Sequence, residues 1–137
     1  MFVLSKIEEE RLATCDVRLQ KLVRKIIETW NRQVLQGHRN QEEQDKFFAE
    51  GKTKLKWPNG EHNALPSRAI DMCPVEEVGG KENIDWKDRE RMSYFAGWVQ
   101  GIAASMGYRI RWGGDWDEDT EVKDNGFDDL VHFEIEN

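Results

Sequence analysis

Apolar residues in the first part of the chain recur at helical spacing. After Asp16, which can cap a helix, they follow the 3.6-residue period through Leu19, Leu22, Val23, Ile26, Ile27 and Trp30. A short helix is predicted to begin at Ser5, because the spacing from Ser5 to Glu8 is that of a capping box. Another is predicted to begin after Asn40 and to stop at Gly51. The N-terminal part is therefore expected to be mainly helical.

Strand patterns are concentrated farther along the chain, where apolar residues alternate or form short runs next to glycine and proline. The predicted strands cover residues 34–35, 68–73, 108–112 and 130–135. Helices that come early and strands that follow predict an α+β fold, with a small, mostly antiparallel sheet and flanking helices. No repeat, linker or second domain is visible, so we expect one domain over residues 1–137.

The longest helix is expected between two of these strands. Residues 75–84 are predicted to be a polar excursion, because they contain Gly79-Gly80 and lack an apolar period. Asp85 is then predicted to cap a helix that continues to about Met106. Earlier in the chain, residues 52–67 carry two prolines and no period, which predicts a loop.

The surplus negative charge lies in one short segment. The chain has 27 acidic and 20 basic residues, which gives a net charge of −7. Residues 115–129 hold eight acids and one base, and the remainder is balanced, with 19 of each sign. No basic run is long enough to bind a phosphate backbone, so nucleic acid is excluded as the main partner.

The chain has no feature of a membrane or disulfide-rich protein. Its two cysteines, Cys15 and Cys73, form no CxxC pair and are expected to be free thiols in a reducing compartment. No apolar run approaches the roughly 20 residues of a membrane span, and the N-terminal apolar stretch is too short for a signal peptide. We therefore expect a monomer that is made in the cytoplasm without an export signal and does not insert into membranes.

Three residues have the chemistry of a metal site. Asp71 and His132 each lie within an otherwise apolar predicted strand, and His62 lies in a loop. A carboxylate in such a strand is costly unless it is paired, hydrogen-bonded or bound to a metal. Two nitrogens, one carboxylate and an open position for water suit catalytic zinc. The alternative is a buried Asp71 that pairs with a base such as Arg68 or Arg109.

Four segments resemble those of the zinc D-alanyl-D-alanine carboxypeptidase and L-alanyl-D-glutamate peptidase family, which includes VanY-like enzymes and many phage endolysins. They are Gln36-Gly-His-Arg39 with Gln44 beyond it, His62-Asn-Ala-Leu-Pro-Ser-Arg-Ala-Ile-Asp71, Arg111-Trp-Gly-Gly-Asp-Trp116 and Asp129-Leu-Val-His132-Phe-Glu134. The first segment is weak by itself, whereas the last three, in this order, are specific. The resemblance covers nearly the whole chain and implies the hedgehog/DD-peptidase-like fold, with His62, Asp71 and His132 as zinc ligands.

One motif departs from the family pattern. Eight residues separate His62 from Asp71, two more than in the commoner form, and Gly60 replaces a serine. Alignment on Asp71 alone would place Ala64 at the histidine position. We interpret the loop as two residues longer and keep His62 as the ligand.

The resemblance also implies roles for residues around the metal. Asp129 is assigned as the general base and later acid, with Asp128 as a rival at the same junction. Glu134 shares a strand face with His132 and could support it. Arg39 would bind the developing oxyanion or a substrate carboxylate, and its alternative is a surface ion pair. His38 should point the other way from Arg39, so we leave it out of the site.

The implied substrate is the stem peptide of bacterial peptidoglycan. The expected activity is zinc-dependent cleavage between L-Ala and D-Glu, by a phage or prophage endolysin that stays in the host cytoplasm until it is released to the cell wall. The nearest alternative is a D-Ala-D-Ala carboxypeptidase. A second alternative, of another class, is a metal-stabilised binding module of the same fold without catalytic turnover.

The acidic segment is a candidate calcium loop. Its alternating acids, Asp115, Asp117, Asp119 and Glu121, match the first half of an EF-hand loop. Thr120 stands where that loop has glycine, and Gly126 falls on its twelfth position, for which Asp124 or Asp128 would have to substitute. A bound cation would cancel the repulsion among the carboxylates and order the approach to Asp129. The alternative is a solvated loop that binds no specific ion.

Overall fold

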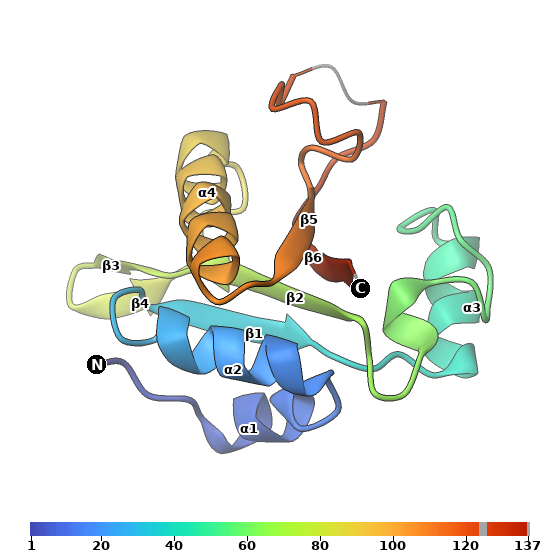
Figure 1. Ribbon diagram of the computed structural model, residues 1–137, viewed down its shortest axis with the longest axis horizontal. Helices are drawn as coiled ribbons and strands as arrows, with labels where there is room; N and C mark the ends of the chain where they lie inside the picture. The colour runs from blue at the N-terminus through green and yellow to red at the C-terminus, as the bar shows by residue number, and fades with distance from the viewer. Residues whose placement is uncertain (124–125, 137) are drawn as a thin grey trace.

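A four-stranded antiparallel sheet forms the centre of the computed structural model, which describes residues 1–123 and 126–136 (Figure 1). The strands lie in the order β1-β2-β6-β5, so that the two strands with metal-competent residues are neighbours in the middle of the sheet. Their bounds are β1 Arg32–Gln36, β2 Ala69–Pro74, β5 Arg109–Gly113 and β6 Asp129–Glu136. This architecture confirms the predicted α+β class with a small antiparallel sheet.

The helices begin where side-chain caps are available. They are α1 Lys6–Leu12, α2 Val17–Ile26, α3 Gln41–Ala49 and α4 Arg89–Ser105; the 3₁₀ turn η1 Glu61–Asn63, which follows Gly60 and has no side-chain cap, lies between α3 and α4. Ser5 and Asn40 form the predicted capping boxes, and Asp16 caps α2. These caps accept hydrogen bonds from N–H groups that a helix cannot satisfy by itself, each stabilising it by about 1 kcal/mol.

The hydrophobic core lies between one face of the sheet and the helices α2 and α4. Alternate residues of the central strands, such as Ile70 and Met72 on β2 and Phe133 and Ile135 on β6, belong to this core. The helices close it with apolar stripes that are fully buried, including Phe95 at 1% exposure. Since side chains alternate along a strand, the residues between these positions face the opposite side of the sheet. That side carries Asp71 and His132.

The edge strand β1 is fixed by a buried acid. The Glu8 carboxylate accepts hydrogen bonds from the Arg32 side chain and from the Val34 backbone N–H, both at 2.9 Å. Both side chains are almost fully buried, so the pair is shielded from solvent. The contact attaches α1 to β1 and leaves the far end of β1 directed toward α3 and η1 (Figure 1).

One local prediction was wrong, and another missed two short strands. Asp85 does not cap the longest helix; it accepts a hydrogen bond from the Lys87 N–H and closes a turn, and Asp88 caps α4. The polar excursion is a hairpin of β3 Glu76–Val78 and β4 Lys81–Asn83, joined by Gly79 and Gly80 at positive φ. Among the described residues, no helix is long and apolar enough to cross a membrane.

Candidate metal centre and its cleft

The residues of the site form rows across the sheet, because they are cross-strand partners. Asp71 of β2 pairs with His132 of β6 on one side and with Gln36 of β1 on the other. Two residues farther along β6, Glu134 is paired with Arg111 of β5. Directly opposed side chains in antiparallel strands lie about 5 Å apart, which brings each pair into contact.

His62 reaches this row from η1, and its ring is held from behind by a backbone carbonyl. Its Nδ1 lies 2.7 Å from the Gly37 carbonyl oxygen. Since that oxygen can only accept, Nδ1 carries a proton, and Nε2 is the nitrogen that faces Asp71 and could turn a lone pair to a metal ion. A side chain at Gly37 would place its Cβ 2.4 Å from the Arg11 carbonyl oxygen, so only glycine fits this bend.

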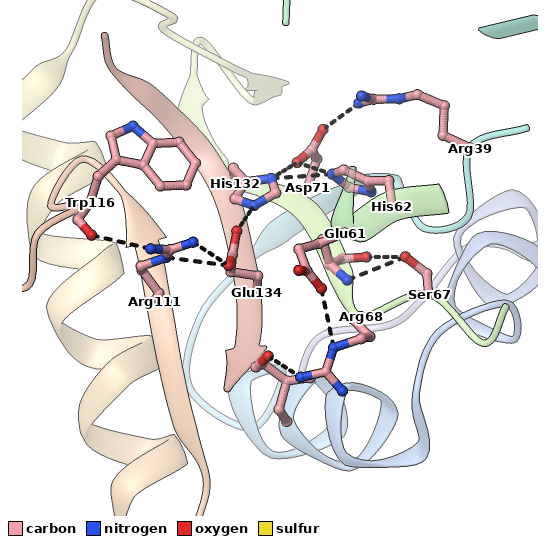
Figure 2. A network of polar contacts seen from close by, with 12 residues as sticks. Arg39, Glu61, His62, Ser67, Arg68, Asp71, Arg111, Trp116, His132 and Glu134 are labelled. Atoms are coloured by element: carbon pink, nitrogen blue, oxygen red, sulfur yellow. Dashed lines mark hydrogen bonds and ion pairs between the residues drawn. The ribbon is translucent and has the colours of Figure 1, made fainter. Parts of the chain in front are cut away.

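His132 is oriented in the same manner by a carboxylate. Its Nε2 lies 2.8 Å from Oε1 of Glu134, and Arg111 donates to Oε2 of that carboxylate, also at 2.8 Å (Figure 2). The carboxylate accepts a hydrogen bond from Nε2–H, so Nδ1 is the nitrogen directed toward Asp71 and His62 and could turn a lone pair to a metal ion that replaces its proton. Hydrogen bonds to His132 and Arg111 outweigh the effect of burial and hold the pKa of Glu134 below its usual range.

The three predicted ligands converge on one point. His62 Nε2 lies 3.0 Å from Asp71 Oδ1, and His132 Nδ1 lies 3.2 Å from His62 Nε2 and 3.5 Å from Asp71 Oδ1 (Figure 2). Ligand atoms in a tetrahedral site with bonds of about 2.0–2.1 Å lie roughly 3.3 Å apart. Two imidazole nitrogens and one carboxylate oxygen with these separations could hold a metal ion.

The charges and hydrogen bonds of His62, Asp71 and His132 also favour the binding of a cation. Burial alone would raise the pKa of Asp71, but the charge of His62 and hydrogen bonds with His132 and His62 keep it well below the usual range. Burial likewise opposes a charged imidazole, yet hydrogen bonds with Asp71 and Glu134 raise the pKa of His132 to about 9. The cluster therefore attracts positive charge, either a proton or a metal ion.

Arg39 is buried beside this centre. Its guanidinium donates to Gln36 Oε1 at 2.8 Å and to Gln44 Oε1 at 3.0 Å, and lies 3.7 Å from Asp71 Oδ2. Burial lowers the pKa of Arg39, and the charges of Asp71 and Asp129 oppose that shift. Phe47 stacks under the guanidinium, with 4.6 Å to its ring centroid. With 9% exposure, Arg39 is a cleft residue and its surface ion-pair alternative does not hold.

The other bases proposed as partners of Asp71 lie elsewhere. Arg68 pairs with Glu61 at 3.1 Å, and Arg109 lies 3.8 Å from Glu118. The structure therefore places histidines and Arg39, rather than these two bases, around the buried aspartate.

Asp128 and Asp129 are adjacent at the start of β6, but their side chains have different surroundings. Asp128 forms an ion pair with Arg89 at 2.7 Å, whereas Asp129 lines the hollow above the three ligands. Burial and the charge of Asp71 raise the pKa of Asp129. Its position depends on Gly113, because a Cβ there would lie 2.1 Å from the Asp129 carbonyl oxygen. The geometry favours Asp129 over its rival as the residue that faces a substrate.

Two hollows adjoin the centre: His62 and His132 line the first, and Asp71 lines the second. The first, of about 460 Å³, extends between the 52–60 loop and the pair formed by Trp116 and Phe127. The second, of about 470 Å³, extends past Phe47 toward Trp86. Arg39, Lys52 and Asp129 line both of them, so that together they form one cleft across the site.

The acidic loop brings three of its four candidate ligands together. Carboxylate oxygens of Asp115, Asp117 and Asp119 lie within 4.8 Å of one another, in a geometry that could hold a metal. Glu121 is not part of this group; its backbone N–H donates to Asp119 at 2.8 Å. Thr120 has a φ of +70°, the left-handed conformation that an EF-hand gives to glycine at this position. Asp124 lies outside the described residues.

The remaining candidates lie away from the cleft. The strand does not continue to His38, because β1 ends at Gln36; His38 Nδ1 lies 3.0 Å from the Ala64 carbonyl oxygen, and the ring lines a separate surface groove. Cys15 and Cys73 are free and buried, and burial raises the pKa of each thiol to about 12. Neither thiol is therefore suited to nucleophilic chemistry at neutral pH.

Some residues of the site were not predicted. Arg111 holds Glu134, the Gly37 carbonyl orients His62, and the Trp116 ring lies 5.3 Å from the His132 ring. Asn63 donates to both Gln44 and the Arg39 carbonyl at 3.1 Å, which fixes the arginine from a second side. Arg111 and Trp116 belong to a segment that the resemblance had singled out, so that segment was the available signal.

Comparison with known proteins agrees with this geometry. Residues 1–135 match the family described as phage L-alanyl-D-glutamate peptidase. The fold is similar to that of the L-Ala D-Glu endopeptidase ChiX of Serratia marcescens, with a TM-score of 0.71 and 19% sequence identity over 97% of this chain and 89% of that one. The predicted resemblance is confirmed: this chain belongs to the phage L-alanyl-D-glutamate peptidase family, and is a hydrolase that acts on peptidoglycan.

Proposed function

We propose that this protein is a zinc-dependent endopeptidase that cleaves the L-alanyl-D-glutamate bond of peptidoglycan stem peptides, with His62, Asp71 and His132 as the zinc ligands. The observation that carries the proposal is the convergence of three ligand atoms 3.0–3.5 Å apart, two of them on histidines whose other ring nitrogens already have partners. The donor set has the composition of a catalytic zinc site that leaves one position open.

The residues of the cleft have separate roles in this proposal. A bound zinc ion supplies polarisation of the scissile carbonyl and acidifies a water molecule. Asp129 takes the proton of the attacking water and returns it to the nitrogen of the leaving D-glutamate. Arg39 binds the oxygen that becomes negative, and Gln36 and Gln44 hold its guanidinium in place.

The experiment is mass spectrometry of the products released from purified peptidoglycan, together with the zinc content of the protein. We expect new amino termini on D-glutamate and one zinc per chain. His62→Ala should lose both zinc and activity, whereas the matched control His38→Ala should keep both. Release of D-alanine would instead indicate the carboxypeptidase, and zinc without any product would indicate the binding module.

We propose further that calcium, or a similar hard cation, binds Asp115, Asp117 and Asp119 and orders the loop that precedes Asp129. Support comes from the three clustered carboxylates and the left-handed φ of Thr120. Burial and neighbouring acids raise the pKa of Asp115, and a cation would relieve this repulsion. Activity should rise with added calcium at fixed zinc, and Asp117→Ala/Asp119→Ala should abolish the rise. Glu42→Ala/Asp45→Ala, which removes the same charge from exposed positions on α3, is the control; calcium-independent activity would refute the site.

We also propose that residues 1–137 act as one catalytic domain and as a monomer. The family match across the chain supports one domain, and light scattering on the purified protein tests the oligomeric state. Membership of a phage family supports synthesis in the host cytoplasm followed by release to the wall. Fractionation of infected or induced cells before and after lysis tests this order.

A further inference from the structure

The two ends of the cleft have different chemistry. Beyond the centre, the first hollow carries the charged side chains of Lys54, Glu61 and Arg111 together with the apolar or aromatic side chains of Leu55, Trp116 and Phe127. The second is walled by the apolar or aromatic side chains of Leu35, Phe47 and Trp86. The hollows share Arg39, Lys52 and Asp129; beyond these and Asp71, the lining of the second hollow has no charged side chain, whereas that of the first has several, so a bound chain that crosses the centre meets charged partners on one side only.

Trp86 is the exposed member of the aromatic end. Its side chain is 58% exposed, so one face of the ring is open to a ligand. It lies in the turn that Asp85 closes by accepting the Lys87 N–H, directly before the Asp88 cap of α4. The backbone around Trp86 is thus fixed at both ends, and the ring forms part of a hollow that Asp71 and Asp129 also line.

The substrate has the same asymmetry as the cleft. On the amino side of the bond between L-alanine and D-glutamate there is a single alanine, which is amide-linked to the lactyl group of a muramyl sugar. One residue and one linkage of similar length place that sugar roughly 7 Å from the scissile carbonyl. On the other side, D-glutamate and the residues beyond it carry carboxylates. Sugar rings present C–H faces that pack on aromatic rings, whereas carboxylates pair with lysine and arginine.

We propose that the hollow lined by Phe47 and Trp86 is the subsite for the muramyl sugar, with Trp86 as its specificity-determining residue. This inference rests on the proposed function, since it assumes cleavage of the L-alanyl-D-glutamate bond. It fixes the direction of the substrate: the glycan end lies toward Trp86 and the anionic peptide toward Lys54 and Arg111. The enzyme then distinguishes peptide attached to glycan from free stem peptide.

The test compares two substrates that differ only in the sugar. One is N-acetylmuramoyl-L-alanyl-D-glutamyl-lysine, and the other is the same tripeptide with an N-acetyl group in place of the muramoyl group. The readout is the ratio of their kcat/KM values for the zinc-loaded protein. We expect the wild type to favour the sugar substrate, and Trp86→Ala to reduce this ratio about three- to tenfold, the effect of one aromatic contact. Trp86→Phe should recover most of the ratio.

The matched control is Trp98→Ala, which removes another exposed tryptophan from α4, outside both hollows. It should leave the ratio unchanged. A second measurement is calorimetric binding of the product N-acetylmuramoyl-L-alanine, which should weaken in Trp86→Ala by the same factor. The proposed subsite would be overturned if Trp86→Ala reduced kcat/KM equally for both substrates, or if the wild type did not prefer the sugar substrate. A wild type that cleaves neither substrate would instead refute the proposed function.

Discussion

Glu134 provides the sharpest test of how the site is built, because it contacts the metal centre only through His132. We predict that Glu134→Gln weakens zinc binding about 10- to 100-fold without removing a ligand. The substitution keeps the shape of the side chain and an oxygen that can accept a hydrogen bond from His132 Nε2–H. It removes the negative charge that fixes this proton on Nε2, and it removes the partner of Arg111.

The magnitude follows from the two hydrogen bonds involved. Glu134 is 6% exposed, and its carboxylate accepts from His132 and Arg111 at 2.8 Å each. A hydrogen bond to a charged group contributes about 1.5–3 kcal/mol, against about 0.5–1.5 kcal/mol for a neutral pair. The difference for the His132 bond is therefore about 1–1.5 kcal/mol, which is about tenfold in affinity. Weaker alignment of the ring adds to this loss.

The assay is competition for zinc with a chromophoric chelator at fixed pH. Glu61→Gln is the matched control, since it removes one negative charge from the wall of the same cleft, where Glu61 pairs with Arg68. We expect a loss of less than threefold for this control. Unchanged zinc affinity in Glu134→Gln, or an equal loss in both variants, would show that Glu134 does not act through His132.

Three further predictions concern the base, the ligand proton and the sheet. Asp129→Asn should keep zinc and reduce kcat by roughly 100- to 10,000-fold, whereas Asp128→Asn should stay active; the opposite order would move the base by one residue. The pKa of His132, raised to about 9, predicts that zinc displaces a proton from the metal-free protein. The affinity for zinc should then rise with pH and level off above about 9. Calorimetry in buffers of different ionisation enthalpy measures the protons released. Zinc uptake without proton release would contradict the prediction. Gly113→Ala should lower the free energy of unfolding by about 1–3 kcal/mol and also reduce activity. The control Gly101→Ala on α4, where a Cβ has open space, should be tolerated in the same denaturation and rate assays.

Local patterns were sufficient to predict most helices, and together with the family resemblance they indicated the three residues that meet at the candidate metal centre. Ser5, Asp16 and Asn40 cap helices as expected, because capping depends on residues only three positions apart. Asp71 and His132 were recognisable because a polar residue in an apolar strand has few explanations. Glu134 followed from the two-residue period of the same strand.

Other features could not be predicted from a local pattern, either because two residues compete for one role or because an element is exposed and has no apolar face. Asp85 and Asp88 both have the chemistry of a helix cap, and the turn closed by Asp85 leaves the cap to Asp88. The β3–β4 hairpin has largely exposed strands, so that no apolar alternation indicates it. Its Gly79-Gly80 pair, with positive φ at both residues, was the one available signal for a tight hairpin turn.

The assembly of the site depends on two irregularities of the sheet, and these explain why its contacts could not be predicted from the strands alone. In β1 the register shifts between Val34 and Gln36, so that Gln36, and not Leu35, lies opposite Asp71 and binds Arg39. In β5 the pairing jumps from Trp112–Phe133 to Gly113–Asp129, so that Asp129, which lines the cleft, lies beside Gly113. A regular ladder would place an apolar side chain beside Asp71. Bulges of this kind re-aim single side chains at the rims of sheets, and here they supply the arginine's partner and the position of the proposed base.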